Sequence, residues 1–421
     1  MIMTYRMRII RLPLMLLFVA CCSGFYSCAS NDVSERGYDT IDTTGYSTIF
    51  IDVEERASLM LSEIADSIWY LRLEETEEST IGNIDKLIFY DDMIVVSDNE
   101  VSESVFVFGS DGRHQATISR RGRGPGEYMR IEDVEVDRDR GVILIYDRSG
   151  GKIVEYDFNG THLASYNSDF VFDGFVWVGG DTMIAYSTYS INPNLRDGPN
   201  SLIFSFNYRN PSQNKTLLAF DMEADYGNKI PLLINNVSGR EDLAYIYDLV
   251  HNSFFSFSEG QLKLAWKLDF GKYNLPESFL KSADRNDWIR EGSRSGSYVG
   301  GVSDFQVAGA WLAGSFSFQG TIISFFYNKL TGEVHHTPSI IMVDLVDGFP
   351  DVLTFPMALP PGFHTDGENI ISVFEPAAVT MILESIKQEA EEHGITLVIP
   401  EELIGLSPND NPLLQFVTLK R

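Results

Sequence analysis

Residues 120–166 read RRGRGPGEYMRIEDVEVDRDRGVILIYDRSGGKIVEYDFNGTHLASY. A glycine-rich loop opens the segment, and short apolar runs separated by tight turns follow it. Val142–Tyr146 and Ile153–Tyr156 are typical of strands, because branched and aromatic side chains fit a pleated, half-buried surface. Asn159-Gly160 then indicates a hairpin, since Asn-Gly adopts the positive φ angles of a tight β-turn. The segment therefore predicts a small antiparallel sheet.

The same order of strands and turns occurs several times along the chain. Upstream, Ile94–Ser97 and Val105–Phe108 precede a turn at Asp111-Gly112. The turn glycines Gly112 and Gly160 lie 48 residues apart. A period of roughly 40–50 residues, with about four strands in each unit, is the sequence signature of a β-propeller blade. Fainter copies follow at residues 243–268 and 321–334.

The length of the repeating region indicates the number of blades. The 341 residues from Ile81 to Arg421 suit six blades better than seven or eight. We therefore predict an all-β fold, a six-bladed β-propeller of four-stranded antiparallel blades over residues 49–421. We expect short helical insertions near residues 275–300 and 376–394. A β-sandwich or a β-solenoid, which also has regular turns, is the alternative that this repeat length disfavours.

A propeller ring has to be closed, because an unpaired strand edge promotes aggregation. Residues 66–73 (DSIWYLRL) have the alternating pattern of a strand, and residues 411–420 (NPLLQFVTLK) read as a terminal strand. We predict that these two segments pair in the last blade and so close the ring.

The N-terminus has the layout of an export leader. Arg6, Arg8 and Arg11 form a basic region, and Leu12–Ala20 is apolar. This apolar run is shorter than the ~20 residues that a membrane-spanning helix needs. We therefore predict that residues 1–27 are a signal peptide.

All three cysteines lie in the first 28 residues, so the body of the chain cannot form a disulfide of its own. Small residues surround Cys28, and a polar segment that resembles a tether continues to residue 48. We predict lipidation at Cys28 as in bacterial lipoproteins, with Cys21 as a competing site. A lipidated cysteine would hold the protein at the cell envelope, on the outer membrane, facing the periplasm or the surface. An ordinary cleaved signal peptide is the alternative.

The loop GRGPGEY at Gly122–Tyr128 resembles NHL-type propeller repeats and, more closely, the six-bladed β-propeller lipoproteins of gut anaerobes. The family's first strand with its acidic turn is matched by WYLRLEETEES at residues 69–79, and its closing segment by NDNPLLQFVTLK at 409–420. The resemblance covers roughly residues 62–421. It implies the fold and an exported, lipid-anchored state, and it implies little about chemistry.

The glycine-rich loop also carries the candidate ligand-binding residues. Arg120, Arg121 and Arg123 have no counterpart in the other repeats and would suit an anionic ligand, and Tyr128 enters the blade directly after them. The alternative is a structural joint between blades, with arginines that pair with nearby carboxylates.

Motifs that carry chemistry are few. No Gly-x-Ser-x-Gly motif occurs. His335 and His336 are adjacent on a predicted strand and so point to opposite faces, which argues against a shared metal ion. Asp137–Gly141 lacks the distal Glu of a calcium loop, and we interpret it as a hairpin turn. The sequence therefore predicts no catalytic residue, no metal site and no cofactor.

The formal net charge of −28 disfavours nucleic acid as a partner, because an acidic surface repels phosphate backbones. We predict a binding or scaffold module for an envelope or extracellular protein, peptide or carbohydrate, which contacts the membrane through its lipid anchor only. The alternative is a hydrolase or lyase with carboxylates or a metal in the central channel. A channel filled by apolar side chains would exclude that alternative. The sequence predicts no oligomeric state.

Overall fold

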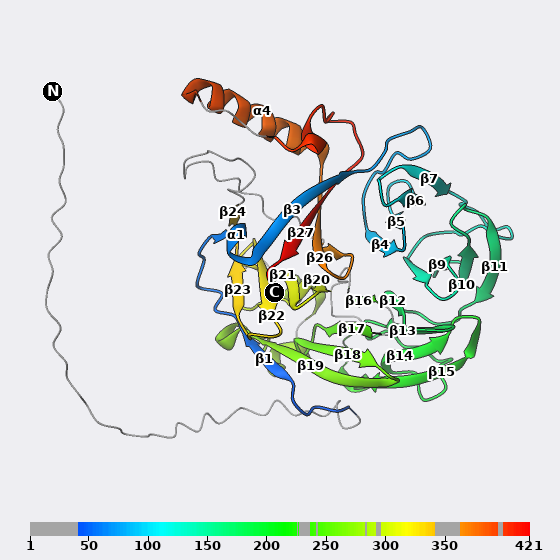
Figure 1. The fold of residues 1–421 in the computed structure, drawn as a ribbon. Coiled ribbons are helices and arrows are strands. Elements are labelled where there is room, and N and C mark those ends of the chain that lie inside the picture. Colours follow the sequence, from blue (N-terminus) through cyan, green and yellow to red (C-terminus); the bar gives the residue numbers. More distant parts are fainter. Residues whose placement is uncertain are drawn as a thin grey trace, which may run out of the picture. The chain divides into compact units, whose positions relative to one another are not determined.

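The computed structural model describes residues 41–224, 226, 236–240, 243–282, 284–291, 296–341, 363–394 and 399–421. Within them, six sheets, each built on four antiparallel strands, form a six-bladed β-propeller, as the sequence predicts (Figure 1). The predicted leader, Cys28 and most of the predicted tether lie outside the described residues.

In the first two blades the strands follow one another along the chain and are joined by hairpins. These are the two clearest sequence repeats, and tight turns with glycines at positive φ join their third and fourth strands, at Gly112 and Gly160. The strands are β4 (Lys86–Tyr90), β5 (Met93–Asp98), β6 (Ser104–Gly109) and β7 (His114–Ile118), then β8 (Asp133–Asp137), β9 (Val142–Asp147), β10 (Lys152–Tyr156) and β11 (His162–Asn167).

The third and fourth blades repeat this order with longer outer strands. The fourth blade gains a fifth strand, β1 (Ser47–Phe50), which pairs parallel to its outer edge. The other strands are β12 (Gly174–Trp177), β13 (Thr182–Tyr186), β14 (Ser201–Asn207) and β15 (Asn210–Ala219), then β16 (Val237–Arg240), β17 (Leu243–Asp248), β18 (Ser253–Ser258) and β19 (Gln261–Asp269).

The sixth blade combines both ends of the propeller, whereas the fifth is continuous in sequence. A small parallel pair, β2 (Leu59–Met60) with β24 (Ile340–Ile341), lies outside the blades. The strands of the two blades are β20 (Val302–Ala308), β21 (Trp311–Phe318), β22 (Thr321–Asn328) and β23 (Val334–Thr337), then β25 (His364–Thr365), β26 (Asn369–Phe374), β27 (Leu413–Leu419) and β3 (Ala65–Arg72).

Pairing of β27 with β3 closes the ring. The two strands are antiparallel, from Leu413 opposite Arg72 to Leu419 opposite Ala65. Asn411 adds a side-chain tie beside them, because its Nδ2 donates to the carbonyl oxygens of Glu74 (2.9 Å) and Ser79 (2.7 Å). The last strand of the chain is therefore held between β26 and the N-terminal strand β3.

Helices are short apart from α4 (Pro376–His393), which occupies a predicted insertion. It begins with Pro at its first position and ends at Gly394, whose φ of 67° is the left-handed cap typical of a helix end. None of the described helices is long and apolar enough to cross a membrane. The remaining helices are α1 (Leu61–Ile64), α2 (Glu277–Ser282) and α3 (Arg285–Ile289), with 3-10 turns at Met222–Ala224, Gly271–Tyr273 and Glu401–Leu403.

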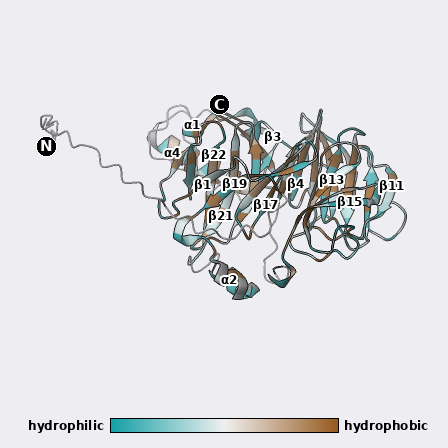
Figure 2. Ribbon diagram, turned by 90° about the horizontal axis from the view of Figure 1, so that it is seen from below, coloured by the Kyte–Doolittle hydropathy of each residue, from teal (hydrophilic) through white to brown (hydrophobic). Residues whose placement is uncertain are grey.

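The hydrophobic core lies between neighbouring blades. Figure 2 shows hydrophobic residues along the strands. Val105 and Val107 of the first blade, for example, share one buried cluster with Ile143, Ile145 and Val154 of the second. Such sheet-on-sheet packing fixes each blade against the next. The innermost strands, one from each blade, then follow one another around a common axis: β4, β8, β12, β16, β20 and β25.

The register of the closing pair can be tested with an engineered disulfide. Ser67 lies opposite Thr418, and cross-strand partners lie within disulfide reach. We expect Ser67→Cys with Thr418→Cys to crosslink, because no other cysteine follows Cys28. The crosslink should raise the free energy of unfolding by about 2–5 kcal/mol, measured by denaturant unfolding with and without reductant.

Ile68→Cys with Thr418→Cys is the matched control. Residues 67 and 68 point to opposite faces of the sheet, so this pair should stay reduced on a non-reducing gel. Crosslinking of the control pair alone would show that the ring closes in another register.

Candidate functional site

A cavity of about 310 Å³ lies on the propeller axis. All six innermost strands contribute to its lining, as do several hairpin turns. Charged and polar side chains from different blades meet there. They include Lys86, Glu135, Arg138, Ser238, Arg240, Tyr245, Gln306, Lys329 and His364.

The turns in the lining identify one end of the cavity. Arg138 follows β8, Gly309 follows β20 and Asp366 follows β25, so each lies in the turn between the first and second strands of its blade. Lys329 follows the third strand of the fifth blade, which runs in the same direction as the first. These turns share one face of the propeller. We call the end of the cavity beside Arg138, Arg240, Lys329 and Asp366 the mouth.

An ion-pair cluster lies deeper on the axis. Lys86 Nζ of β4 lies 3.0 Å from Asp133 Oδ1 and 3.7 Å from Glu135 Oε2 of β8. The two acids share a face because they are two residues apart on a strand. Asp133 Oδ2 also accepts the amide hydrogen of Phe175 on β12 (3.0 Å). The cluster therefore ties three blades together at the centre.

Burial and ion pairing shift the pKa values of Lys86 and Glu135 in opposite directions. Burial disfavours the charged form of Lys86, but Asp133 and then Glu135 outweigh it and raise the lysine's pKa. Burial raises the pKa of Glu135, and Lys86 and Arg138 only partly offset this effect. Glu135 is therefore a carboxyl group that takes up a proton more readily than a surface glutamate.

His364 of β25 faces the same cavity and is 4% exposed. Burial, with a smaller contribution from Lys86, lowers its pKa to about 4. The ring is therefore neutral near pH 7, and a neutral imidazole has one donor and one acceptor nitrogen.

Positive charge gathers at the mouth of a strongly acidic protein. Arg138 donates from a guanidinium nitrogen to the carbonyl oxygen of Phe89 (2.9 Å), and Arg240 donates to that of Asp366 (2.7 Å). Lys329 is partly buried, and burial lowers its pKa. These three cations and Lys86 make the cavity a local exception to the net charge of −28.

Polar and aromatic groups complete the lining. Ser238 Oγ donates to Gln306 Oε1 (2.6 Å), and Gln306 Nε2 donates to the carbonyl oxygen of Phe363 (3.0 Å). Tyr245 stacks on Trp266 with ring centroids 5.3 Å apart. The channel is therefore not filled by apolar side chains, which was the condition that would have excluded catalysis. Within the described part of the chain, no group of three or more His, Cys, Asp or Glu residues is placed to hold a metal ion.

The glycine-rich loop lies elsewhere. Arg120, Arg121 and Arg123 are exposed and are not part of the cavity lining, and Arg121 pairs with Glu103. Tyr128 has no exposed surface, and its hydroxyl donates to the carbonyl oxygens of Glu103 (2.8 Å) and Ile118 (3.0 Å). In this structure the Tyr128 side chain therefore stabilises the connection between the first two blades. A ligand role for the three arginines stays a prediction.

The loop's glycines are explained by close contacts. Gly126 has a φ of 71°, and a Cβ there would lie 2.5 Å from the His162 ring. Its carbonyl oxygen accepts from the Tyr156 hydroxyl (2.6 Å). Glu127 folds back and accepts the amide hydrogen of Gly124 (2.7 Å). The GPGEY sequence thus packs the connection between the first two blades.

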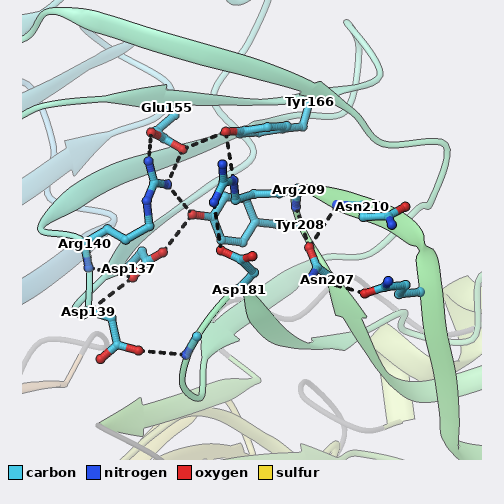
Figure 3. Close-up of polar contacts among 12 residues, drawn as sticks. Asp137, Asp139, Arg140, Glu155, Tyr166, Asp181, Asn207, Tyr208, Arg209 and Asn210 are labelled. Carbon is cyan, nitrogen blue, oxygen red and sulfur yellow. Dashed lines mark hydrogen bonds and ion pairs between the residues drawn. The ribbon is translucent and has the colours of Figure 1, made fainter.

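Residues 137–141 form a hairpin turn that also joins two blades (Figure 3). Arg140 makes two hydrogen bonds of 2.6 Å to Glu155, which is 1% exposed. Tyr208 of the third blade donates to Asp137 Oδ2 (2.7 Å) and accepts from Arg140 (2.7 Å). Each charge in this network has partners, so the network is a structural tie.

Sequence reasoning missed the residues at the axis. One signal was present: Asp133 and Glu135 alternate with apolar residues in DVEVD, which places two acids on one face of a strand. Lys86 and His364 gave no comparable signal, because each stands alone at the start of a short strand.

A family model described as "Domain of unknown function (DUF4934)" matches residues 47–418. Among solved structures, one from Bacteroides fragilis described as a "putative exported protein" has a TM-score of 0.64 at 13% identity, covering 89% of this chain and 100% of its own. A DUF4221 family member from Bacteroides vulgatus has a TM-score of 0.44 at 10% identity, covering 85% and 97%. The first similarity supports the fold. No curated protein sequence matches the chain.

His364 should contribute to acid sensitivity. Its pKa falls from 6.5 in the unfolded chain to about 4 in the folded one, so its neutral form favours folding. This contribution is complete above pH 6.5 and is lost as the pH falls towards 4. We expect His364→Gln to reduce the loss of unfolding free energy over this range by about 3 kcal/mol, measured by urea unfolding at several pH values.

His162→Gln, on the outer strand β11, is the control and should leave the pH dependence close to that of the unmodified protein. If the unfolding free energy varied with pH equally in His364→Gln, His162→Gln and the unmodified protein, the assignment of acid sensitivity to His364 would be wrong.

Proposed function

The chain belongs to the DUF4934 family, and we propose that it is an exported binding module that takes its ligand into the mouth of the central cavity. The observation that carries this proposal is the polar cavity of about 310 Å³ at the meeting point of six blades. Pockets for small ligands have volumes of about 300–1,000 Å³. A single small ligand, or one terminal residue of a larger one, suits this size.

The lining supports binding through its mixture of groups. Ser238, Gln306 and His364 offer donors and acceptors, and Tyr245 offers an aromatic surface. Binding sites are mostly built in this way, from a few polar groups placed within a preformed concavity. A carbohydrate, a peptide end or a protein loop remains the ligand class that the sequence predicts.

Catalysis is the second candidate, and Glu135 is the observation that favours it. Its raised pKa and its position in the cavity are typical of a general acid. Asp133, two residues away, is paired with Lys86 at 3.0 Å. A hydrolase or lyase would use this pair. Release of product from a bound glycan, lost in Glu135→Gln with binding kept, would establish it.

Export and anchoring are the finer parts of the proposal. The B. fragilis neighbour is described as exported, and the sequence resembles propeller lipoproteins of gut anaerobes with NHL-like repeats. Both support export through the predicted leader and attachment through Cys28, at the outer membrane or elsewhere in the envelope.

Blocking the cavity tests the binding proposal. Val307 lies in the lining, so Val307→Trp should fill the space and remove the ligands that a glycan array and a peptide library detect with the unmodified protein. Leu163→Trp, at an exposed position of β11, should keep them. Undiminished binding by Val307→Trp would place the ligand outside the cavity and would favour the arginines of the glycine-rich loop as its site.

Lipidation is tested by labelling the expressed chain with a fatty acid. We expect label and membrane association to be lost in Cys28→Ala and kept in Cys21→Ala. The reverse pattern would move the anchor to Cys21, and unlabelled protein in both cases would indicate a cleaved, soluble product.

A further inference from the structure

We infer that the mouth recognises the carboxylate of an acidic sugar, a hexuronate at the end of a glycan. This inference rests on the proposed function, because it names the ligand class of the same cavity. Three features carry it: the Lys329 ammonium group, which has no partner among the described residues, the Arg138 N–H donors that the described residues leave free, and the aromatic and polar groups beside them.

Lys329 is the first feature. Its side chain is partly buried beside the cavity, and among the described residues its ammonium group has no ion pair or hydrogen bond. A buried charge is costly unless it is paired. A ligand carboxylate in the cavity would supply the missing partner and would restore the lysine's preference for its charged form, which burial weakens.

Arg138 is the second feature. One guanidinium nitrogen bonds to the Phe89 carbonyl oxygen at 2.9 Å, and the group lies 6.0 Å from the centre of the Tyr90 ring. A guanidinium has five N–H donors in a planar fork that fits a carboxylate. Within the described residues, the hydrogen bond to Phe89 accounts for one nitrogen, so donors remain for a ligand at the mouth.

The rest of the lining favours a sugar over another carboxylate. Tyr245, stacked on Trp266, supplies an apolar aromatic surface of the kind that packs against a sugar ring. Ser238 and Gln306 form a hydrogen-bonded pair beside it, which suits hydroxyl groups. A peptide C-terminus would also satisfy the cations, but it lacks the several hydroxyl groups and the ring face that a sugar presents to this polar pair and this aromatic surface.

Net charge favours a single terminal residue over a long polyanion. Interactions between exposed charges are largely screened beyond about 8 Å at physiological ionic strength. One carboxylate placed among the cations of the mouth therefore experiences their attraction. A polyanion lying across the outside would meet a protein of net charge −28.

The test compares three probes by titration calorimetry with the purified protein: galacturonate, its neutral analogue galactose, and N-acetylalanine as a mimic of a peptide C-terminus. We expect galacturonate to bind about tenfold more tightly than galactose, since a hydrogen bond to a charged group contributes that much or more. Lys329→Met should remove this preference by weakening the binding of galacturonate.

Two variants make the readout specific. Lys329→Arg keeps the charge and should keep the preference, which separates loss of charge from loss of fold. Lys152→Met removes one positive charge at the start of β10, on the opposite face, and should behave like the unmodified protein. Added salt should weaken galacturonate binding and leave galactose binding unaffected.

Several results would overturn the inference. Equal affinity for galacturonate and galactose, or a preference that persists in Lys329→Met, would remove the carboxylate from the recognition. Tighter binding of N-acetylalanine would assign the site to peptide ends. If none of the probes binds at millimolar concentration, the hexuronate assignment fails, whereas the binding proposal is decided separately by the arrays and Val307→Trp.

Discussion

The antiparallel pairing of β27 with β3 is the contact on which the propeller depends, because it turns a row of six sheets into a ring. In an open row the innermost strands would face solvent, and the outer edges of β27 and β3 would be free to pair with other chains. In the closed ring, side chains from blades far apart in sequence meet at the axis. Lys86, Glu135 and His364 come from three different blades and line one cavity for this reason.

At the centre of the ring, desolvation disfavours the charged forms of ionisable side chains, and ion pairing favours them. Asp133 pairs with Lys86 and accepts a backbone amide hydrogen, whereas burial raises the pKa of Glu135 and lowers that of His364. Removing one partner of such a buried pair costs about 3–5 kcal/mol. The cluster thus stabilises the arrangement of the blades, and the same burial makes its members chemically distinct from surface residues.

The sequence predicted the fold well, because a blade repeats local signals. Asp-Gly and Asn-Gly turns, alternating apolar runs and a strand-ending aspartate recur, and buried Asp98 and Asp147 show why: each accepts backbone amide hydrogens from the adjoining loop or turn. The cavity could not be predicted in the same way. β25 has two residues, and its blade combines segments more than 300 residues apart, so His364 has no repeat context.

The glycine-rich loop shows the converse: a conspicuous sequence motif that lies outside the cavity. Its arginines are conspicuous in the linear sequence, but whether a loop borders the cavity depends on the face of the propeller on which that loop lies.

The last blade also constrains the order of events during synthesis. β3 is made early, and its partner β27 follows more than 300 residues later. Until β27 has been synthesised, β3 lacks its sheet partner, so the ring closes and the cavity is completed only after the strands of all six blades have been made.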